Sequence, residues 1–464
     1  MTLQAATDPM RIHPNRLIHF WRTRPEPWRV AIVGFLIARL LYGLWSAIIL
    51  SIQPLAVQNI VISGEPVLAV FNLNTSQANT YLREINGQAL AFRPWGENTM
   101  ADLQTGSIWN ASTGTAVEGH YTGSMLLPSS TSPSRLFPYH QRAPYPAGWL
   151  AIWQRFDANW YLSIAEDNYG RIGGDVHFPP LFPALIRLLR PLFGSTFLAG
   201  LFIAHLATLY AIKLLYEVYR NWGDALTARR TTALFLLYPT SFFLFSVYSE
   251  SLFLVAVLLS LRCMTMHDWP WAGFWAFCAF LTRLQGAALV IPMLYLMWSD
   301  QPSLRRPVHW FSLALPVTGG LLYLFLRSTQ ATNDIIPLVE ANLHARLVPP
   351  WENYWYAVQT LLSGEFAFVD LLNWIVVTLF IMLLAYGWHR IPLAYNLYTT
   401  FSLIFVLMRM VETQPLVSMS RYSLTLFPAF FVLSQASDNP WARRLITYAF
   451  ISLNLYLSAQ FFSW

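Results

Sequence analysis

The chain has 464 residues, of which 55% are hydrophobic, 16% are aromatic and only 11% are charged. Soluble proteins carry about 25% charged residues, so this composition excludes a soluble enzyme, a nucleic-acid-binding protein and a disordered scaffold. It predicts a polytopic membrane protein. Apolar runs, several of them close to the roughly 20 residues that cross a bilayer, occur at residues 30–50, 197–212, 252–261, 310–326, 371–388, 391–408 and 445–462.

The chain opens with a basic segment, residues 1–27, that contains Arg11, Arg16 and Arg22. This long polar stretch before the first apolar run argues against a cleavable signal peptide. Basic residues next to a span usually mark its cytoplasmic end. We therefore expect residues 28–52 to form an uncleaved first transmembrane helix, with the N-terminus in the cytoplasm.

Residues 53–148 interrupt the hydrophobic pattern and are rich in Asn, Thr, Ser, Gly and Pro. Polar and apolar residues alternate in runs such as 59–70, which indicates β-strands. Because a single span precedes this stretch, we expect a small β-rich extracytoplasmic insert.

Residues 149–194 are expected to form helices at the outer membrane surface. Apolar residues at helical spacing predict an amphipathic helix over residues 155–165. Residues 178–193 could be a second span or an interfacial helix with Arg187 and Arg190 at headgroup level. We prefer the interfacial alternative, because it leaves the later basic loops in the cytoplasm.

The rest of the chain, residues 195–464, is expected to form the transmembrane bundle, with an outer loop at about 328–354. This interpretation gives about eleven transmembrane helices. A break in a membrane helix exposes backbone polar groups, which persist only inside protein or in a water-filled cavity. Three such breaks are predicted near the outer surface, and we expect a site where they meet; they lie at residues 238–241, 282–286 and 420–422.

Asp157 is the first candidate for chemistry. A lone aspartate here could be a solvated charge or the N-cap of the following helix. However, it belongs to a longer pattern, in which DANWYLSIA (residues 157–165) is followed by FPPLFP (residues 178–183). This pattern resembles the first outer loop of the GPI mannosyltransferase PIG-V family, within the glycosyltransferase C superfamily.

Further blocks support the same resemblance, and all of them follow in the family's order between about residue 153 and residue 430. They are YPTSFF (238–243), YSESLF (248–253), RLQG (283–286), RY (421–422) and FP (427–428). The resemblance implies a bundle like that of the glycosyltransferase C superfamily. It also implies an inverting enzyme without a metal or another cofactor, which moves a sugar, mannose first, from a polyprenyl-phosphate donor to an acceptor hydroxyl.

The implied chemistry assigns roles to individual residues. A carboxylate accepts the proton of the attacking hydroxyl, and we expect Asp157 to be this base. A guanidinium binds phosphate oxygens bidentately, and we expect Arg283 and Arg421 to bind the donor phosphate. Further substrate contacts are expected from residues in or near the matched blocks, namely Tyr161, His177, Glu250, Gln285 and Tyr422.

The expected partners are the lipid-linked sugar donor, membrane lipids, and a lipid, glycan or protein acceptor of unknown identity; no nucleic acid is expected. We expect an active site on the extracytoplasmic side, in the plasma membrane of a bacterium or the endoplasmic reticulum of a eukaryote. Cys263 and Cys278 lie in apolar runs, so neither a disulfide nor a zinc site is expected. Glu166 and Asp167 are expected to face solvent.

Other interpretations remain open at this point. The arginines could snorkel to lipid headgroups, Glu250 could be an ordinary interfacial charge, and His177 could lie in a solvated loop. The protein could be a transporter or flippase that binds a lipid-linked sugar without reacting it. It could also be a membrane scaffold whose function resides in the insert. Transporters often contain internal repeats, and we find none, which favours the enzyme.

Overall fold

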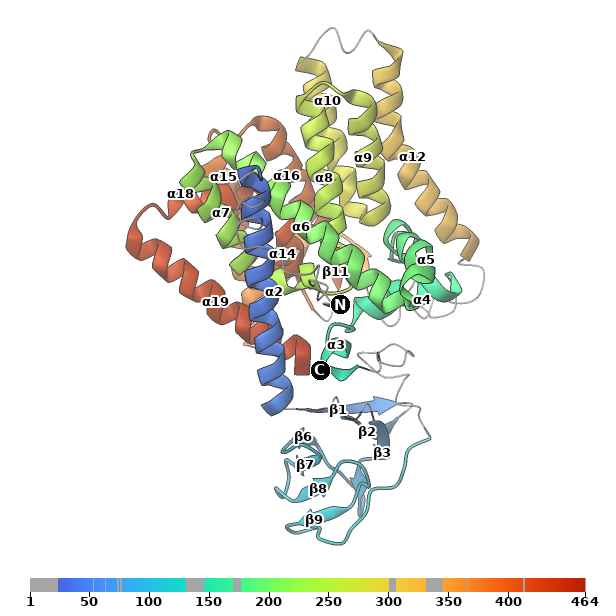
Figure 1. Cartoon of the computed structure of the whole chain (residues 1–464). Helices are drawn as coiled ribbons and strands as arrows, with labels where there is room; N and C mark the ends of the chain where they lie inside the picture. Colours follow the sequence, from blue (N-terminus) through green and yellow to red (C-terminus); the bar gives the residue numbers. More distant parts are fainter. Residues whose placement is uncertain are drawn as a thin grey trace, which may run out of the picture.

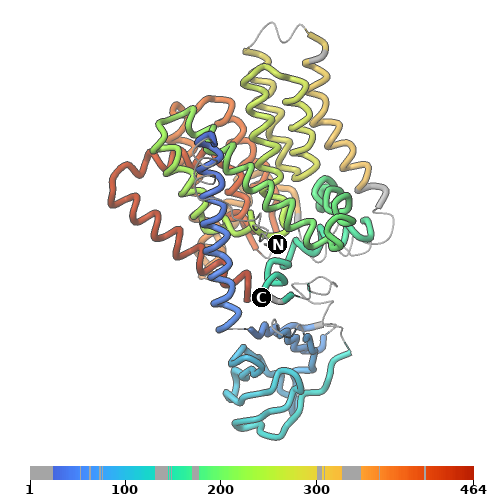
Figure 2. The backbone as a smooth tube through the Cα atoms, viewed as in Figure 1, coloured from blue at the N-terminus to red at the C-terminus, as the bar shows by residue number. Residues whose placement is uncertain are grey.

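The structure is a computed structural model with a helical bundle at one end and a small β-rich unit at the other (Figures 1 and 2). Most of the basic segment 1–27 and of the expected outer loop 328–354 lies outside the residues that the structure describes. Those residues are 24–52, 54–62, 64–72, 75, 77–130, 145, 147–169, 177–299, 306–330, 345–364, 366–411 and 414–463.

Five described helices are long and apolar enough to cross a membrane. On the first of them, Leu36, Leu40 and Leu44 are 59%, 63% and 56% exposed. Such a leucine face is stable in contact with lipid, whereas in water it would be costly. These helices, or the part of the helix that qualifies, are α2 (Glu26–Ile52), α6 (Thr196–Trp222), His309–Leu326 within α12 (Pro307–Gln330), α15 (Phe368–Gly387) and α19 (Pro440–Ser463).

Six shorter helices among the described residues pack with these five in the bundle. They are short because the chain breaks or turns within the bundle. They are α7 (Ala225–Leu237), α8 (Glu250–Thr265), α9 (Trp269–Thr282), α10 (Val290–Ser299), α16 (Leu393–Leu407) and α18 (Pro428–Ala436). The prediction of an integral, mainly helical membrane protein with a small β insert is thus confirmed.

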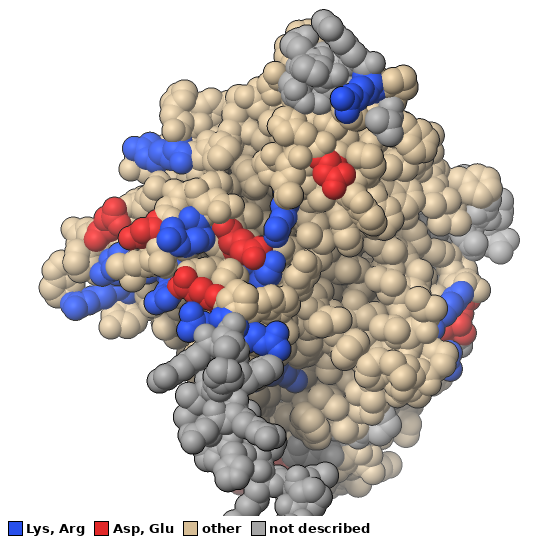
Figure 3. All heavy atoms as spheres, turned by 45° about the horizontal axis from the view of Figure 1, so that its top comes forward, with Lys and Arg blue, Asp and Glu red and all other residues tan. Residues whose placement is uncertain are grey.

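Charged residues gather at the end of the bundle opposite the insert, and much of the visible surface beyond them carries no charge (Figure 3). There Arg229 pairs with Glu26 at the start of α2, and Arg262 pairs with Glu217 at 2.9 Å. Arg229 and Arg262 belong to the later basic segments that the sequence places in the cytoplasm, and the structure brings them to the same end as the N-terminus of α2.

The described part of the insert contains nine strands and has a hydrophobic core of its own, which includes Leu68, Met100 and Trp109. The alternating run at residues 59–70 forms parts of β1 and β2, paired antiparallel from Leu55↔Asn72 to Ile62↔Glu65. The strands are β1 (Leu55–Ile62), β2 (Glu65–Asn72), β3 (Gln77–Leu82), β4 (Glu84–Ile85), β5 (Gln88–Ala89), β6 (Phe92–Pro94), β7 (Thr99–Asp102), β8 (Ile108–Asn110) and β9 (Ala116–Glu118). They form sheets in the orders β1-β2-β3, β4-β5 and β6-β7-β8-β9.

A buried carboxylate stabilises the four-stranded sheet of this unit. The Trp109 indole donates to Asp102 at 3.0 Å, and the Thr105 backbone N–H donates to it at 2.6 Å. Burial opposes ionisation of Asp102, but these hydrogen bonds outweigh it and hold its pKa below the usual value. The insert is therefore a folded unit with a specific polar contact in its core.

Two helices follow the insert, after the short helix α3 (Gly148–Ala151): α4 (Asp157–Asp167) and α5 (Leu181–Phe193). The expected amphipathic helix over 155–165 corresponds to α4. The 13 residues of α5 reach about 20 Å, too short to cross the roughly 30 Å hydrocarbon layer.

Arg187 of α5 and Glu166 of α4 make contacts that the sequence did not predict. The Nε of Arg187 donates to the Ala165 carbonyl at 2.7 Å and its Nη2 to the Ile164 carbonyl at 2.8 Å. Both carbonyls belong to the last turn of α4, so Arg187 joins α5 to the end of α4. Glu166 was expected to face solvent, but it accepts a hydrogen bond from Thr196 at the start of α6.

The remaining elements connect the bundle helices around the site. They are η3 (Ser241–Phe245), η4 (Leu284–Leu289), β10 (Ala345–Leu347), α14 (Pro350–Ser363), β11 (Arg409–Val411), α17 (Met419–Tyr422) and η5 (Ser423–Thr425). Four of them, η3, η4, α17 and η5, stand at the three predicted helix breaks.

Candidate active site

The three predicted helix breaks are present and lie side by side. α7 ends at Leu237 because Pro239, two residues later, cannot continue the helix. The hydroxyl of Thr240 in this first break donates to the Ser420 carbonyl in the third break at 2.8 Å. Gln285 in the second break donates to Thr425 in the third at 2.8 Å. Segments far apart in the sequence thus meet at one place in the bundle.

Gly286 allows the second break to fold tightly. A Cβ at this position would lie 2.5 Å from the Phe280 nitrogen and 2.6 Å from the Ala279 carbonyl carbon, both backbone atoms of α9. Only glycine lets η4 pack back onto α9 without moving it. This close approach fixes the positions of Arg283 and Gln285.

The Gly286→Ala variant is expected to lower the stability of the protein by about 1–3 kcal/mol, because the methyl group overpacks against backbone that cannot yield. It should also weaken donor binding by displacing Arg283. Thermal unfolding and a donor-binding titration measure the two effects. Gly319→Ala in α12 is the matched control, because its Cβ would meet the side chain of Phe277 first, at 3.1 Å. Equal effects of the two variants would contradict this account of Gly286.

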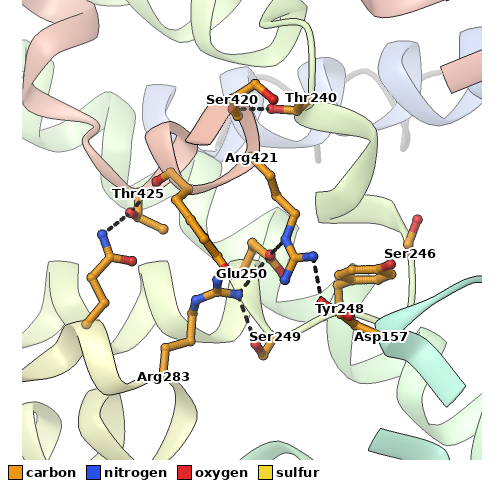
Figure 4. A network of polar contacts seen from close by, with 12 residues as sticks. Asp157, Thr240, Ser246, Tyr248, Ser249, Glu250, Arg283, Ser420, Arg421 and Thr425 are labelled. Carbon is orange, nitrogen blue, oxygen red and sulfur yellow. Dashed lines mark hydrogen bonds and ion pairs between the residues drawn. The ribbon is translucent and has the colours of Figure 1, made fainter. Parts of the chain in front are cut away.

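Four ionisable side chains form one network, to which the second and third breaks contribute Arg283 and Arg421 (Figure 4). Arg421 binds Asp157 through Nη1 at 2.6 Å and Glu250 through Nε at 2.5 Å. Arg283 binds the same Glu250 oxygen through Nη1 at 2.8 Å. We call Asp157, Glu250, Arg283 and Arg421 the ion-pair cluster. It holds two positive and two negative charges, and Glu250 connects the two guanidinium groups.

The cluster is buried at Glu250 and opens toward Asp157. Glu250 is 0% exposed, whereas 27% of the Asp157 side chain is accessible. The second oxygen of Glu250, Oε2, is buried and has no hydrogen-bond partner in the described part of the chain. Removing one partner from a buried ion pair is strongly destabilising, by about 3–5 kcal/mol. The accessible carboxylate is therefore the one suited to meet a substrate.

Both carboxylates lie in the first turn of a helix, where the helix dipole stabilises negative charge. Glu250 begins α8 and Asp157 begins α4. Phe156, directly before Asp157, has a φ of 49°. A positive φ is costly for a bulky residue, and such strain is concentrated at functional sites. The backbone thus turns sharply to point Asp157 into the cluster.

Aromatic rings enclose the guanidinium groups. The Arg421 guanidinium carbon lies 4.9 Å from the ring centroid of Tyr248 and 5.2 Å from that of Phe243. Tyr422 lies 5.4 Å from Arg421 and 5.1 Å from Arg283. These cation–π contacts hold both side chains in place without using their N–H donors.

Hydroxyl groups form a second set of contacts around the cluster. Ser249 accepts from Arg283 at 3.3 Å and shares a 2.8 Å hydrogen bond with Tyr161. Gln285 donates to Ser402 and to Thr425, both at 2.8 Å. Ser402 and Thr425 carry no signal in the sequence that marks them as site residues, because a single hydroxyl in an apolar helix is common.

The structure therefore brings together most of the residues predicted for the site. Asp157, Glu250, Arg283 and Arg421 are in direct contact, and Tyr161, Gln285 and Tyr422 surround them. His177 lies half-buried at the turn before α5, on the connection between α4 and α5 instead of within the ion-pair cluster. Among the described residues, no three His, Cys, Asp or Glu side chains are grouped so that they could hold a metal ion.

One part of the chain matches a known family. Residues 177–326 match the model of a family described as dolichyl-phosphate-mannose-protein mannosyltransferase. This segment includes Glu250, Arg283 and Gln285, whereas Asp157 and Arg421 lie outside it. The match supports a glycosyltransferase of the C superfamily, which is the broader part of the resemblance seen in the sequence.

Among solved structures, the chain is similar to ArnT from Cupriavidus metallidurans, determined with bound undecaprenyl phosphate. The two chains are 14% identical, and the similarity has a TM-score of 0.42 and covers 64% of this chain and 58% of that chain. No curated protein matches the chain.

Proposed function

We propose that this protein is an inverting glycosyltransferase that moves a sugar, most directly mannose, from a polyprenyl-phosphate donor to an acceptor hydroxyl. The ion-pair cluster is the observation that carries this proposal, because it combines one accessible carboxylate with two fixed guanidinium groups. The family match at residues 177–326 supports the same chemistry and is the reason for choosing mannose.

In the proposed reaction, Asp157 accepts the proton of the acceptor hydroxyl while that oxygen attacks the anomeric carbon of the sugar. The bond from this carbon to the phosphate oxygen breaks at the same time, so the anomeric centre inverts. One base is enough for such a direct displacement, unlike the paired carboxylates of glycoside hydrolysis. The accessible edge of Asp157 suits this role.

The departing lipid phosphate gains negative charge, which Arg283 and Arg421 stabilise. A guanidinium has five N–H donors, and the hydrogen bonds of Arg421 to Asp157 and Glu250 use two of them. Glu250 holds the two arginines at one place and keeps them apart from solvent. We further propose that the site faces the extracytoplasmic side, because the insert and the start of α4 lie at the same end of the bundle (Figure 1).

The decisive experiment incubates the purified full-length protein with radiolabelled polyprenyl-phosphate mannose or glucose and a membrane lipid extract. We expect labelled product from the mannose donor, with inverted anomeric configuration. Retained configuration, or no transfer from either donor, would contradict the proposal. A reconstituted protein that moves the donor across vesicles without forming product would identify a transporter instead.

A further inference from the structure

A groove separate from the ion-pair cluster lies between α2, α3 and the insert. It has a volume of about 530 Å³, and its lining includes Arg39, Gly43 and Ser51 of α2, Trp149 and Trp153 on or next to α3, and Glu97 of the insert. This volume lies within the range of about 300–1,000 Å³ that is usual for small-molecule sites. None of the proposed catalytic residues lines the groove.

Arg39 at one end of the groove is an unusual residue for its position. It is the fourteenth residue of the 27-residue helix α2, so it begins near the middle of a membrane span. Its guanidinium lies 4.7 Å from the ring centroid of Trp153. Its Nη1 is buried without a hydrogen-bond partner among the described residues. An intramembrane arginine is costly unless it is paired, and it indicates a functional site.

Gly43, one turn from Arg39 toward the insert, keeps the groove open. In the described chain, nothing lies within 4 Å of the position that a Gly43 Cβ would take. The adjacent residues Leu40 and Leu44 are 63% and 56% exposed on the lipid-facing side of the helix. The groove is therefore open beside a surface that contacts lipid, so a lipid can enter it from the bilayer.

Glu97 provides the opposite charge at the insert end. It is an exposed residue between β6 and β7, and no ion pair within 4.0 Å joins it to Arg39 among the described residues. The groove thus presents a cation on the membrane side and a carboxylate on the insert side. Trp149 and Trp153 also line the groove, and indole rings are typical of the membrane interface.

We propose that this groove binds the headgroup of a phospholipid that carries a primary ammonium beyond its phosphate, the phosphatidylethanolamine class. The phosphate binds Arg39 by charge-assisted hydrogen bonds, and the ammonium binds Glu97. A headgroup without the ammonium offers Glu97 no positive charge, so the Glu97 carboxylate faces only the negative charge of the lipid phosphate. A quaternary ammonium has no N–H to donate to the carboxylate.

Native mass spectrometry of the purified full-length protein tests this site, with phosphatidylethanolamine, phosphatidylcholine and phosphatidylglycerol titrated separately. We expect the wild type to bind phosphatidylethanolamine most tightly. Arg39→Gln should weaken the binding of phosphatidylethanolamine and of phosphatidylglycerol alike, by at least about tenfold. This is the effect of losing one hydrogen bond to a charged group. Glu97→Gln should remove the preference for phosphatidylethanolamine and strengthen phosphatidylglycerol binding.

A third variant, Gly43→Leu, fills the groove and should weaken the binding of all three lipids. The matched controls are Arg190→Gln, an exposed cation of α5, and Glu118→Gln, an exposed carboxylate of the insert; both should bind like the wild type. An unchanged lipid preference in Glu97→Gln would overturn the proposal. So would displacement of the lipid by millimolar inorganic phosphate, which would identify a site for a water-soluble anion. Thermal unfolding of each variant verifies that it is folded.

Discussion

The Asp157→Asn variant is expected to lose sugar transfer while it keeps most of its donor binding. Asparagine preserves the shape of the side chain but cannot accept the proton of the acceptor hydroxyl. Loss of a general base typically lowers the rate by about 10²- to 10⁴-fold. Arg421 keeps its bond to the buried Glu250 in this variant, so the phosphate site should remain in place. The measurements are the transfer rate with a labelled donor and the Kd of the donor.

Asp167→Asn provides the matched control, because Asp167 is an exposed carboxylate at the other end of the same helix. It should transfer sugar at the wild-type rate. If Asp157→Asn formed product at an unchanged rate, Asp157 would have no part in the chemistry. A loss of donor binding equal to the loss of transfer would instead identify Asp157 as a residue that positions Arg421.

The Arg421→Ala variant is expected to weaken donor binding much more than acceptor binding. Arg421 joins Asp157 to Glu250 (Figure 4), and Asp157 is the accessible member of the cluster. Loss of hydrogen bonds to a charged phosphate costs about 1.5–3 kcal/mol, which corresponds to about a 10- to 150-fold rise in the donor Kd. Titration of the donor and of the acceptor measures the two affinities separately.

The same substitution removes one partner of a buried ion pair, so it should also lower stability by up to about 3–5 kcal/mol. Arg421→Lys separates the two effects, because it keeps the positive charge but loses the bidentate geometry. Arg409→Ala is the control: Arg409 is exposed and donates to the Tyr422 hydroxyl at 3.3 Å, next to the cluster but outside it. Donor-binding curves of Arg421→Ala that match those of the wild type, in protein shown to be folded, would exclude Arg421 from the phosphate site.

The difference between the two variants tests whether Asp157 and Glu250 have different roles in the cluster. Asp157 is the accessible member, whereas Glu250 has no exposed surface. A carboxylate that takes a proton from a substrate must be reached by it, while one that only holds two arginines need not be. These roles predict that Asp157→Asn loses sugar transfer but keeps its affinity for the donor. They also predict that Arg421→Ala loses its affinity for the donor.

Much of the fold follows from local patterns. The apolar run at residues 30–50 predicts α2, the alternation at residues 59–70 predicts parts of β1 and β2, and Tyr238-Pro239 predicts the end of α7. Each of these features depends on residues close together in the chain, whose periodicity and backbone restrictions act locally. For the same reason, the three helix breaks could be located before any contact between them was known.

Contacts between residues far apart in the sequence could not be predicted from local patterns. Arg187 was expected at headgroup level from the positions of the later basic loops, and nothing in its own segment indicated that it would bind carbonyls of α4. Ser402 and Thr425 likewise have no local signal, although Gln285 connects them beside the cluster. Arg39 was visible as an arginine within a span, yet nothing near it in the sequence pointed to Glu97 or to the groove.

The amino-acid sequence alone determined that this protein lies in a membrane, where its helices break and which ionisable residues stand at the breaks, because charge content and periodicity are properties of short segments. Only the tertiary structure decided that Arg421 binds Glu250, 171 residues away, and Asp157, 264 residues away. The physical reason is that a buried charge requires a partner within about 3 Å, and helix packing selects that partner from the whole chain.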